Sequence, residues 1–550
     1  MGESARDIRE RFQWTFPIVF SHHNPNVLYT ASQRVWKTAD GGQRWEAISP
    51  DLTRHSPETM GPSGGPITRD QTGVETYATV FALAPSYHDP NVIWAGSDDG
   101  YVHVTRDGGA TWQNVTPPDA PNFVRINTIE ASPTTPGKAY VAGIRYLVDN
   151  DRAPYVWKTE DFGRSWTKIV TGIPGDDFVR AVREDRKRPG LLFAGSERTV
   201  YVSWNDGGSW QPLTLNLPNT QVSDLQVTDD DLVIATHGRS FWVLYGIAPL
   251  RQLTPEVVEE SAHLFDPVDP LRGLDYGVQV VYYLKEPADS LAIEFLDAAG
   301  ETIQTYSAAK EEPAERAGSA DDEESFFSRR TPQPSLDAGS HTFSWNLRYP
   351  GYTDFDGRIF WAAGNFGPAA VPGRYQVRLR TGGVEQTREF EIGLDPRLRG
   401  QVTVAQLQAR FDLALRIRDR VSAANEAVIR IRALKADIDQ RVEQADDRGI
   451  TRQAETVKTR LGAVEGEIYQ VRNQSSQDPL NFPIKLNNKL AALMGVVESA
   501  EAPPTAQSYE VFDDLSGKLQ AQLDRLETVI ATDLGRLNEL LAAKGLEAVK

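Results

Sequence analysis

The chain has 550 residues, a formal net charge of −18, 40% hydrophobic residues and 24% charged residues. Its length predicts about three to five domains, because one hydrophobic core does not extend over so long a chain. The acidic balance argues against a nucleic-acid backbone or an anionic membrane surface as the main partner. The absence of cysteine excludes disulfides, thiolate metal sites and a cysteine nucleophile. No apolar run reaches about eighteen residues, so no membrane span is predicted.

A motif recurs four times in the first 245 residues: Ser or Thr, then Asp two residues on, Gly four on and Trp seven on. The copies, here called Asp-boxes, are Thr38, Asp40, Gly42 and Trp45; Thr105, Asp107, Gly109 and Trp112; Thr159, Asp161, Gly163 and Trp166; and Ser203, Asn205, Gly207 and Trp210. The short polar side chain can hold a tight turn, the glycine allows positive φ, and the tryptophan packs between sheets. We therefore interpret these residues as scaffold rather than as catalytic groups.

Two strand-like runs precede each Asp-box, for example 79–86 and 92–99. With the strands that flank the box, each unit has four antiparallel strands. Such units, recurring at intervals of 67, 54 and 44 residues, predict β-propeller blades over residues 1–247. A fifth unit, 222–244, lacks a box and has only three strands.

Asp-boxes, or BNR repeats, are shared by sialidases, xyloglucanase-type glycoside hydrolases and the sortilin/Vps10 ectodomain. The stretches RFQWTFPIVFSHHNPNVLYTASQRVWKTADGGQRWEAISPDLT, DLVIATHGRSFWVL, LRYPGYTDFDGRIFW and NFPIKLNNKLAALMGVV resemble large bacterial Vps10/sortilin-like proteins labelled "glycosyl hydrolase". The resemblance covers nearly the whole chain. It implies a periplasmic or secreted location, although this chain carries no signal peptide.

Members of that family usually have more blades on the N-terminal side, so the resemblance implies that this chain begins in mid-propeller. Its first twelve residues are too charged to supply the strand that the fifth blade lacks. We therefore expect an incomplete ring, which a missing N-terminal half or a second chain would complete. A ring of four or five blades within one chain is the alternative.

The second half of the chain predicts two further domains. A linker is expected over 248–270 and an immunoglobulin-like β-sandwich over 271–397, interrupted by a disordered acidic loop at 308–335. From 398 to 550 the hydrophobic period changes to that of helices and predicts an antiparallel four-helix bundle. The four apolar stripes begin at Ile417, Val457, Leu486 and Leu515.

Ligand sites of propellers generally lie on the face opposite turns such as the Asp-boxes. The ligand-binding candidates expected on that face are Arg34, Arg152, Arg198, His237 and Arg239; the carboxylate candidates are Asp98, Asp99, Glu75 and Glu197, with Asp70, Asp149, Asp151, Asp176 and Asp177 in neighbouring loops. For His237 and Arg239, a hydrogen-bond network at a strand end is the favoured explanation. No histidine spacing typical of a metal site and no phosphate-binding glycine loop occurs, so no metal and no cofactor are predicted.

Two functions fit this rim of mixed charge. The favoured one is a sortilin-like module that binds a peptide, protein or glycan without chemistry. The alternative is a glycoside hydrolase, which needs two carboxylates at a suitable separation, one of them protonated. The sialidase version also needs an arginine cluster, and its usual Arg-Ile-Pro signature is absent, since Arg125 is followed by Ile126 and Asn127.

Overall fold

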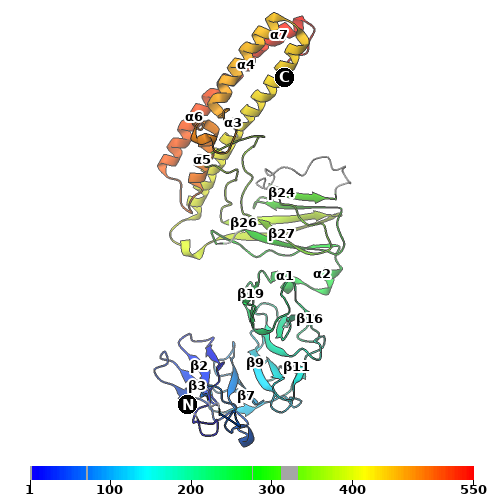
Figure 1. The fold of residues 1–550 in the computed structure, drawn as a ribbon, viewed down its shortest axis with the longest axis vertical. Coiled ribbons are helices and arrows are strands. Elements are labelled where there is room, and N and C mark those ends of the chain that lie inside the picture. The colour runs from blue at the N-terminus through cyan, green and yellow to red at the C-terminus, as the bar shows by residue number, and fades with distance from the viewer. Residues whose placement is uncertain (1–2, 70–71, 275–276, 311–331) are drawn as a thin grey trace. The chain divides into compact units, whose positions relative to one another are not determined.

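The computed structural model describes residues 3–69, 72–274, 277–310 and 332–550, and it divides into two compact units (Figure 1). Unit 1 is Met1–Gln252 and unit 2 is Leu253–Lys550. Two expectations fall wholly or largely outside the described residues. They concern Asp70 and most of the acidic loop expected at 308–335, of which 311–331 is not described.

Unit 1 contains five antiparallel sheets that follow one another along the chain. Four have four strands and the fifth has three, which confirms the blades and the short fifth unit predicted from the repeat. Blade 1 contains β1 (Ile18–Phe20), β2 (Leu28–Ala31), β3 (Val35–Thr38) and β4 (Glu46–Ala47); blade 2 contains β5 (Val80–Pro85), β6 (Ile93–Ser97), β7 (Val102–Thr105) and β8 (Gln113–Asn114). A short 3-10 helix, η1 (Pro57–Thr59), lies between them.

The remaining blades repeat this order. Blade 3 contains β9 (Arg125–Ala131), β10 (Ala139–Arg145), β11 (Asp151–Thr159) and β12 (Thr167–Lys168); blade 4 contains β13 (Val179–Glu184), β14 (Leu192–Ser196), β15 (Val200–Ser203) and β16 (Gln211–Pro212); blade 5 contains β17 (Val222–Val227), β18 (Leu232–Thr236) and β19 (Phe241–Leu244). The core of unit 1 lies between the blades. Between blades 3 and 4, for example, Tyr140, Val182 and Trp210 are buried in one apolar cluster.

The Asp-box forms the turn between the third and fourth strands of its blade. In the second box Thr105 Oγ1 accepts the Gly109 N–H at 2.9 Å and donates to Asp107 Oδ1 at 2.8 Å. The Trp112 ring N–H donates to the carbonyl oxygen of Ile48 in the preceding blade, at 2.8 Å. The other boxes repeat the threonine or serine contacts. Each box therefore closes its own turn, and the tryptophans of blades 2, 3 and 4 bind the preceding blade.

The segment 248–270 is not the plain linker that the sequence suggested. It forms α1 (Ala248–Gln252), α2 (Pro255–Glu259) and β20 (Ala262–Leu264). Thr254 caps α2 by accepting the Val257 N–H, and β20 pairs with β22 of the following sheet. The β-domain therefore begins nearer Ala262 than the expected residue 271, because β20 completes its smaller sheet.

Two sheets build the β-domain of unit 2. One has the strand order β20-β22-β25 and the other β21-β27-β26-β23-β24. The remaining strands are β21 (Leu271–Arg272), β22 (Val278–Leu284), β23 (Ser290–Leu296), β24 (Thr302–Ala309), β25 (Gly339–Trp345), β26 (Gly373–Thr381) and β27 (Val384–Leu394). Both sheets contribute to one core, in which the rings of Phe295 and Trp345 stack at 4.7 Å. A two-sheet arrangement is thus present, while its immunoglobulin type stays a prediction.

Helices fill the rest of unit 2. They are α3 (Val404–Ala445), α4 (Arg448–Ile468), α5 (Leu486–Val497), α6 (Ala506–Thr528) and α7 (Gly535–Ala543), with a π-helical turn η5 (Val529–Leu534) joining the last two and short 3-10 turns η3 (Pro396–Leu398) and η4 (Asp478–Leu480). Thr403 and Gln406 form a capping box that begins α3. Each of the four predicted apolar stripes lies on one of these helices.

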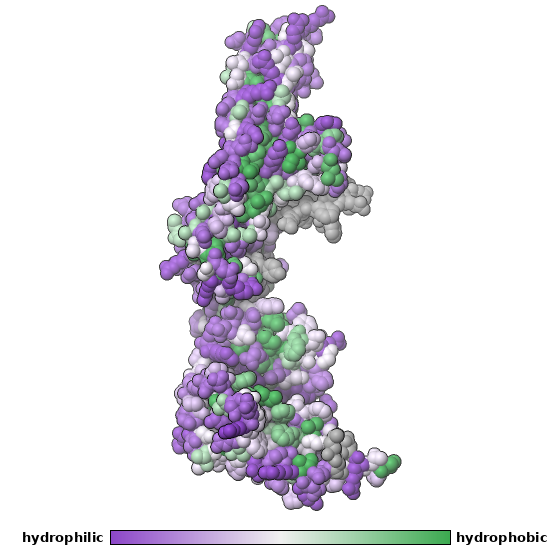
Figure 2. Space-filling view, turned by 90° about the vertical axis from the view of Figure 1, so that its left-hand side faces the viewer, coloured by the Kyte–Doolittle hydropathy of each residue, from purple (hydrophilic) through white to green (hydrophobic). Residues whose placement is uncertain are grey.

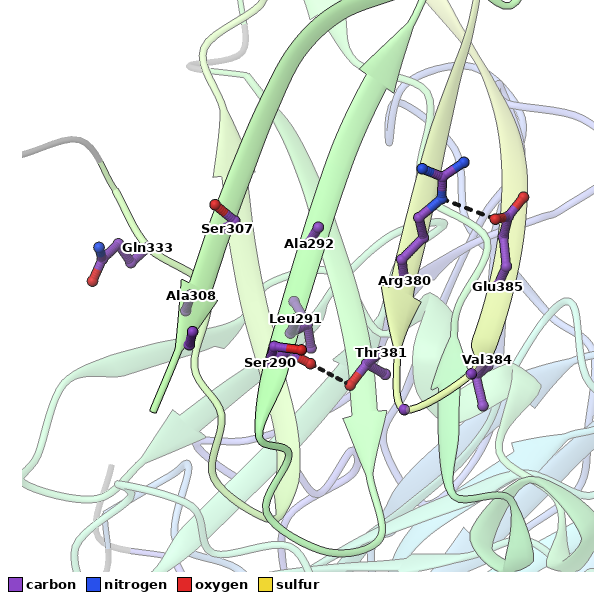
Figure 3. Close-up of a pocket in the computed structure, with 13 residues that line it drawn as sticks. Ser290, Leu291, Ala292, Ser307, Ala308, Gln333, Arg380, Thr381, Val384 and Glu385 are labelled. Carbon is purple, nitrogen blue, oxygen red and sulfur yellow. Dashed lines mark hydrogen bonds and ion pairs between the residues drawn. The ribbon is translucent and has the colours of Figure 1, made fainter. Parts of the chain in front are cut away.

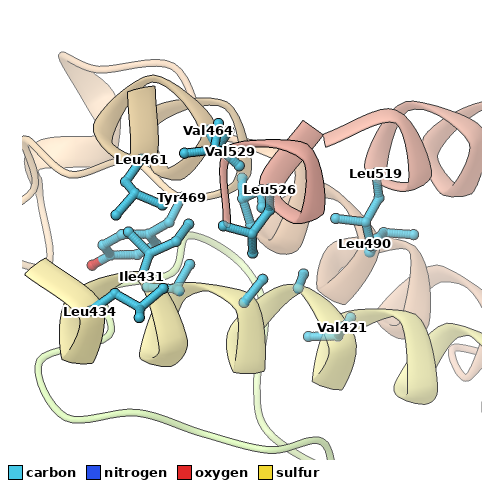
Figure 4. Packing of buried hydrophobic residues seen from close by; sticks show 14 of the residues in the cluster. Val421, Ile431, Leu434, Leu461, Val464, Tyr469, Leu490, Leu519, Leu526 and Val529 are labelled. Carbon is cyan, nitrogen blue, oxygen red and sulfur yellow. The ribbon is translucent and has the colours of Figure 1, made fainter. Parts of the chain in front are cut away.

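The bundle has three legs rather than the four expected, because α4 and α5 lie one after the other along α3. Glu465 near the end of α4 binds Arg432 and Lys435 of α3. Asn487 at the start of α5 binds Asn425, about two to three turns earlier in α3. The continuous α6–η5–α7 segment forms the third leg and contacts both α4 and α5. Figure 4 shows the apolar side chains of these helices meeting in one cluster.

Within the described part of the chain, no helix combines the length and the apolar character that a bilayer crossing requires.

Candidate functional site

The starts of the first strands define a face of unit 1 opposite the Asp-boxes. The first strands of consecutive blades contact one another, so they are the innermost strands. Thr79, just before β5, binds Asp98 in the loop after β6, which places the strand starts beside the loops between second and third strands. We call this surface the loop face: the starts of β5, β9, β13 and β17 with the loops that follow β6, β10, β14 and β18.

The same irregularity occurs near the start of four innermost strands. The pairing of the first with the second strand skips one residue in blades 2, 3, 4 and 5. The skipped residues are Phe81, Asn127, Arg180 and Ser223. A β-bulge re-aims the side chain of its extra residue. The repeat of one bulge in four blades therefore sets four side chains at the loop face in an equivalent way.

Arg125, the first residue of β9, is the principal unpaired charge of this face. Its guanidinium lies over the Phe81 ring at 4.6 Å, and its Nη2 donates to Asn127 Oδ1 at 3.2 Å. Its Nε is buried without a hydrogen-bond partner, and none of the ion pairs among the described residues includes it. Burial is the largest influence on the pKa of Arg125 and lowers it, whereas the nearby carboxyl of Asp98 acts to raise it. A cation held out of water without a counter-ion is costly, which makes this guanidinium a candidate anion receptor.

Arg180, the bulge residue of blade 4, has its charge neutralised. Its Nε and Nη2 both donate to Glu197 Oε2, at 3.0 and 2.8 Å. The rings of Tyr146 and Phe178 stack on each other at 4.8 Å, and the guanidinium lies 5.4 and 5.0 Å from them. The carboxylate candidate Glu197 is therefore occupied as the partner of Arg180.

Asp98 is buried, and both its carboxyl oxygens are occupied. The Thr79 N–H and hydroxyl donate to Oδ1 and Oδ2, each at 2.8 Å. Burial raises the pKa of Asp98 to about 7, with a further contribution from the charge of Asp99. Burial also raises the pKa of the nearby Tyr77, and Asp98 and Asp99 add to that effect. Asp98 is thus the acid of this face that can hold its proton near neutral pH.

Asp99 organises the loop that it occupies. The Ser97 hydroxyl donates to Asp99 Oδ1 at 2.6 Å, and the Arg54 N–H donates to Oδ2 at 2.8 Å. Arg54 Nε donates to the carbonyl oxygen of Asp99, and its guanidinium lies 4.4 Å from the Tyr101 ring centre. Burial raises the pKa of Asp99. The carboxylate therefore holds two segments of blades 1 and 2 together.

Other predicted residues make contacts of their own. Arg198 pairs with Asp176 at 2.6 Å, and Arg152 donates to Asn150 at 3.3 Å. Glu75 accepts the ring N–H of an exposed tryptophan, Trp14, at 2.8 Å.

The loop after β18 carries the exposed pair His237 and Arg239. The Arg239 N–H donates to Thr236 Oγ1 at 3.1 Å, and its carbonyl accepts the Trp242 ring N–H at 2.9 Å. These bonds use the backbone of Arg239, so a role of the two side chains in a strand-end network stays a prediction. In blade 1, Arg34 resembles Arg125 in one respect, since its Nε is buried and has no hydrogen-bond partner.

Three of the carboxylate candidates, Asp98, Asp99 and Glu197, thus lie on the loop face, each bound to other groups. Sequence reasoning passed over Arg125, noting only that its neighbours break a signature. A usable signal was present, because Arg125 directly follows an inter-blade loop and begins an innermost strand. That Arg125 has no ion pair among the described residues is visible only in the structure.

A cavity of about 550 Å³ in the β-domain is a weaker candidate (Figure 3). Arg380 is its principal charged group, and Glu385 and Glu294 neutralise it at 2.9 and 3.2 Å. Ser290 accepts the Thr381 hydroxyl through its carbonyl oxygen. The polar groups of this wall are therefore already paired, and little remains to select a ligand. Among the described residues, no three His, Asp or Glu side chains gather as a metal site would require.

Comparison with known proteins yields similar structures only. No protein-family model matches the chain, and no curated protein matches it. An ancestral GH74 enzyme is 15% identical with a TM-score of 0.31, over 70% of this chain and 55% of that one. The GH74 enzyme of Niastella koreensis is 12% identical with a TM-score of 0.32, over 69% and 52%. The chain therefore spans about half the length of these two enzymes.

A third similar structure is the β-propeller domain of Cps50 (Swd1) from Myceliophteria thermophila. It is 12% identical with a TM-score of 0.31, over 57% of this chain and 91% of that one. The β-propeller is the fold that the blade topology of unit 1 already shows.

Proposed function

We propose that unit 1 is a binding module for a peptide, protein or glycan, and that Arg125 on the loop face receives an anionic group of the ligand. One observation carries the proposal: Arg125 is largely withdrawn from water, stacked on Phe81, and has no ion pair among the described residues. A ligand carboxylate would supply the counter-ion, and a guanidinium suits it because its planar donors match two oxygens.

Neighbouring groups favour a ligand with a flat or apolar part beside its anion. Phe81, Tyr77 and Tyr146 lie around Arg125. Aromatic faces bind sugar rings and apolar side chains alike. An acidic sugar and the carboxyl end of a peptide therefore both fit, and binding measurements with both kinds of ligand distinguish them.

Hydrolysis of a glycoside is the second candidate. It is favoured by Asp98, because burial raises its pKa to about 7, which suits a general acid at neutral pH. A second, free carboxylate is also needed. Glu197 is bound by Arg180, and Asp99 by Ser97 and Arg54. Binding without chemistry is therefore the better supported function.

Three finer assignments belong to the same proposal. They are the kinship with bacterial Vps10/sortilin-like BNR proteins, the immunoglobulin type of the β-domain, and a periplasmic or secreted location. The kinship and the location rest on the resemblance of the quoted sequence stretches, and the immunoglobulin type rests also on the alternating strand pattern.

Saturation-transfer NMR on the full chain tests the binding function. The ligands are glucuronate, N-acetylneuraminate and a tetrapeptide with a free C-terminal carboxylate, each beside a neutral counterpart: glucose, N-acetylmannosamine or the amidated peptide. We expect transfer to at least one acid and not to its counterpart, and loss of the signal in Arg125→Met.

The matched control is Arg198→Met, which removes an exposed arginine already paired with Asp176 and should leave binding unchanged. Binding that survives Arg125→Met, or no binding by any acid, would refute the proposal. Release of reducing sugar from a glycoside, abolished by Asp98→Asn, would instead establish the hydrolase.

A further inference from the structure

The buried carboxyl of Asp98 is held close to the strand that supports Arg125. The Asp98 N–H donates to the Thr79 carbonyl oxygen at 2.9 Å, and the Thr79 N–H and hydroxyl donate back to the Asp98 carboxyl. Two residues after Thr79, the Phe81 ring lies under the Arg125 guanidinium. Asp98 and Arg125 therefore hold fixed positions on neighbouring blades of the loop face.

The surroundings of Asp98 favour its neutral form. The residue is only 3% exposed, and the donors that its two oxygens accept from are the uncharged groups of Thr79. It takes part in none of the ion pairs found in the described ranges of the chain, because Arg54 contacts the adjacent Asp99 instead. A buried carboxyl with uncharged donors and a carboxylate beside it keeps its proton to a higher pH than an exposed one.

The charges of Asp98 and Arg125 act on each other without an ion-pair contact. Burial lowers the pKa of Arg125, and the charge of Asp98 opposes that effect. Burial likewise raises the pKa of Asp98, and the charge of Arg125 opposes that effect. An ionised Asp98 therefore neutralises part of the potential of Arg125, whereas a protonated Asp98 leaves it intact.

The other charged and titratable groups around Asp98 are Arg54, Tyr77 and Asp99, besides Arg125. Both arginines keep their charge at all physiological pH values. Burial raises the pKa of Tyr77, so its hydroxyl keeps its proton. Burial also raises the pKa of Asp99, while contacts that include Arg54 act against it. The carboxyl whose pKa lies at about 7 is that of Asp98, so its charge changes near neutral pH.

We propose that Asp98 controls the anion site by competing with the ligand for the positive charge of Arg125, an inference that rests on the proposed binding function. Hydrophilic side chains dominate the viewed surface of unit 1 (Figure 2, lower half), and the whole chain has a net charge of −18. The local charge at Arg125 therefore decides whether an anion is attracted. Affinity for the anion falls as Asp98 ionises, and by linkage the bound anion makes Asp98 take up a proton.

Saturation-transfer NMR titrations of the full chain at about pH 6 and about pH 8.5 test this coupling, because ligand carboxylates stay charged throughout that range. The ligands are glucuronate, N-acetylneuraminate and the tetrapeptide with a free C-terminal carboxylate. For each acid that binds, we expect a dissociation constant at least about threefold larger at the higher pH. Asp98→Asn is uncharged at both pH values, so it should bind the acid at the higher pH about as tightly as the native protein does at the lower pH.

The matched control is Asp289→Asn, the same substitution at an exposed carboxylate of unit 2 that pairs with Lys310; it should keep the native pH dependence. Equal affinity of the native protein at both pH values, or an equal fall in Asp98→Asn, would overturn the control by Asp98 and leave Arg125 as an anion receptor. So would loss of binding in Asp98→Asn at both pH values, with the fold intact by circular dichroism. No binding by any acid at either pH would refute the proposed function, and the control by Asp98 with it.

Discussion

At the scale of single residues, the buried carboxyl of Asp98 makes stability depend on pH. Its pKa in the folded protein is raised to about 7 from an ordinary value of 3.8. Between about pH 4 and 7 the unfolded chain releases this proton while the folded chain keeps it. The unfolded state therefore binds fewer protons, and the free energy of unfolding falls as the pH rises through this window. Below it, both states are protonated and the contribution is constant.

Asp98→Asn should remove this part of the pH dependence. The amide oxygen can still accept the Thr79 N–H, so the loop keeps its main contact. Urea unfolding at pH 5 and pH 8, followed by tryptophan fluorescence, measures the effect. We expect a smaller loss of stability between these pH values in the variant than in the native protein. Part of the loss persists, because burial also raises the pKa of Glu130 to about 7. Equal losses in both proteins would show that Asp98 does not hold its proton.

At the scale of elements, the two box tryptophans at the ends of the series form a matched pair. Trp210 is buried between blades 3 and 4 and donates to Ile169, while Trp45 is exposed on blade 1. Trp210→Ala should lower the free energy of unfolding by about 3–5 kcal/mol, because it leaves a cavity in a packed layer. Trp45→Ala, measured on dilute protein, should cost less than about 1 kcal/mol. Similar costs for the two substitutions would contradict the packing described here.

A buried charge network joins the β-domain to the bundle within unit 2. Glu498 accepts hydrogen bonds from Arg348 and the Ala369 N–H of the β-domain, at 2.9 and 3.2 Å. Arg410 of α3 lies 3.5 Å from the same carboxylate, and both side chains are almost fully buried. Arg410 also binds Glu501 and the carbonyl of Ala500.

Glu498→Ala should cost about 3–5 kcal/mol of unfolding free energy, because it takes one of two carboxylates from the buried Arg410 and removes the carboxylate that Arg348 binds. Arg410→Met combined with Glu498→Ala should cost less than the two single substitutions added together. A double-mutant cycle in urea, read by circular dichroism of the helices, measures this coupling. Costs that simply add would mean that the two groups do not interact.

At the scale of the whole molecule, the repeats made most of the architecture predictable. The Asp-boxes mark the third turn of each blade, and alternating residues mark its strands, so the blades followed from local pattern alone. The shortness of blade 5 was also visible, because 222–244 has no box. The arrangement of the helices could not be predicted in this way. Apolar stripes show which face of a helix is buried. They do not show that α4 and α5 lie one after the other along α3, which follows from the contacts of Glu465 and Asn425.

The position of the loop face could be predicted from the sequence, but the pairing of its charged side chains could not. Topology indicated which loops gather there, and Asp98, Asp99 and Glu197 do lie on it. Which charges remain unpaired depends on contacts between distant segments. Glu197 pairs with Arg180 and Asp98 binds Thr79, so Arg125 remains without a counter-ion. The position of Arg125 at a strand start can be read from the sequence, but no local pattern shows that it lacks an ion pair.

The proposed role of Arg125 is to bind a ligand rather than to stabilise the fold. Urea unfolding of the native protein and of Arg125→Met, without ligand, tests it most directly. Ten of the twelve tryptophans lie in unit 1, so their fluorescence follows the unit that carries the site. We predict that Arg125→Met is more stable by about 1–3 kcal/mol, because an unpaired cation no longer has to leave water. A variant less stable than the native protein would show that Arg125 stabilises the fold, and would contradict its proposed role.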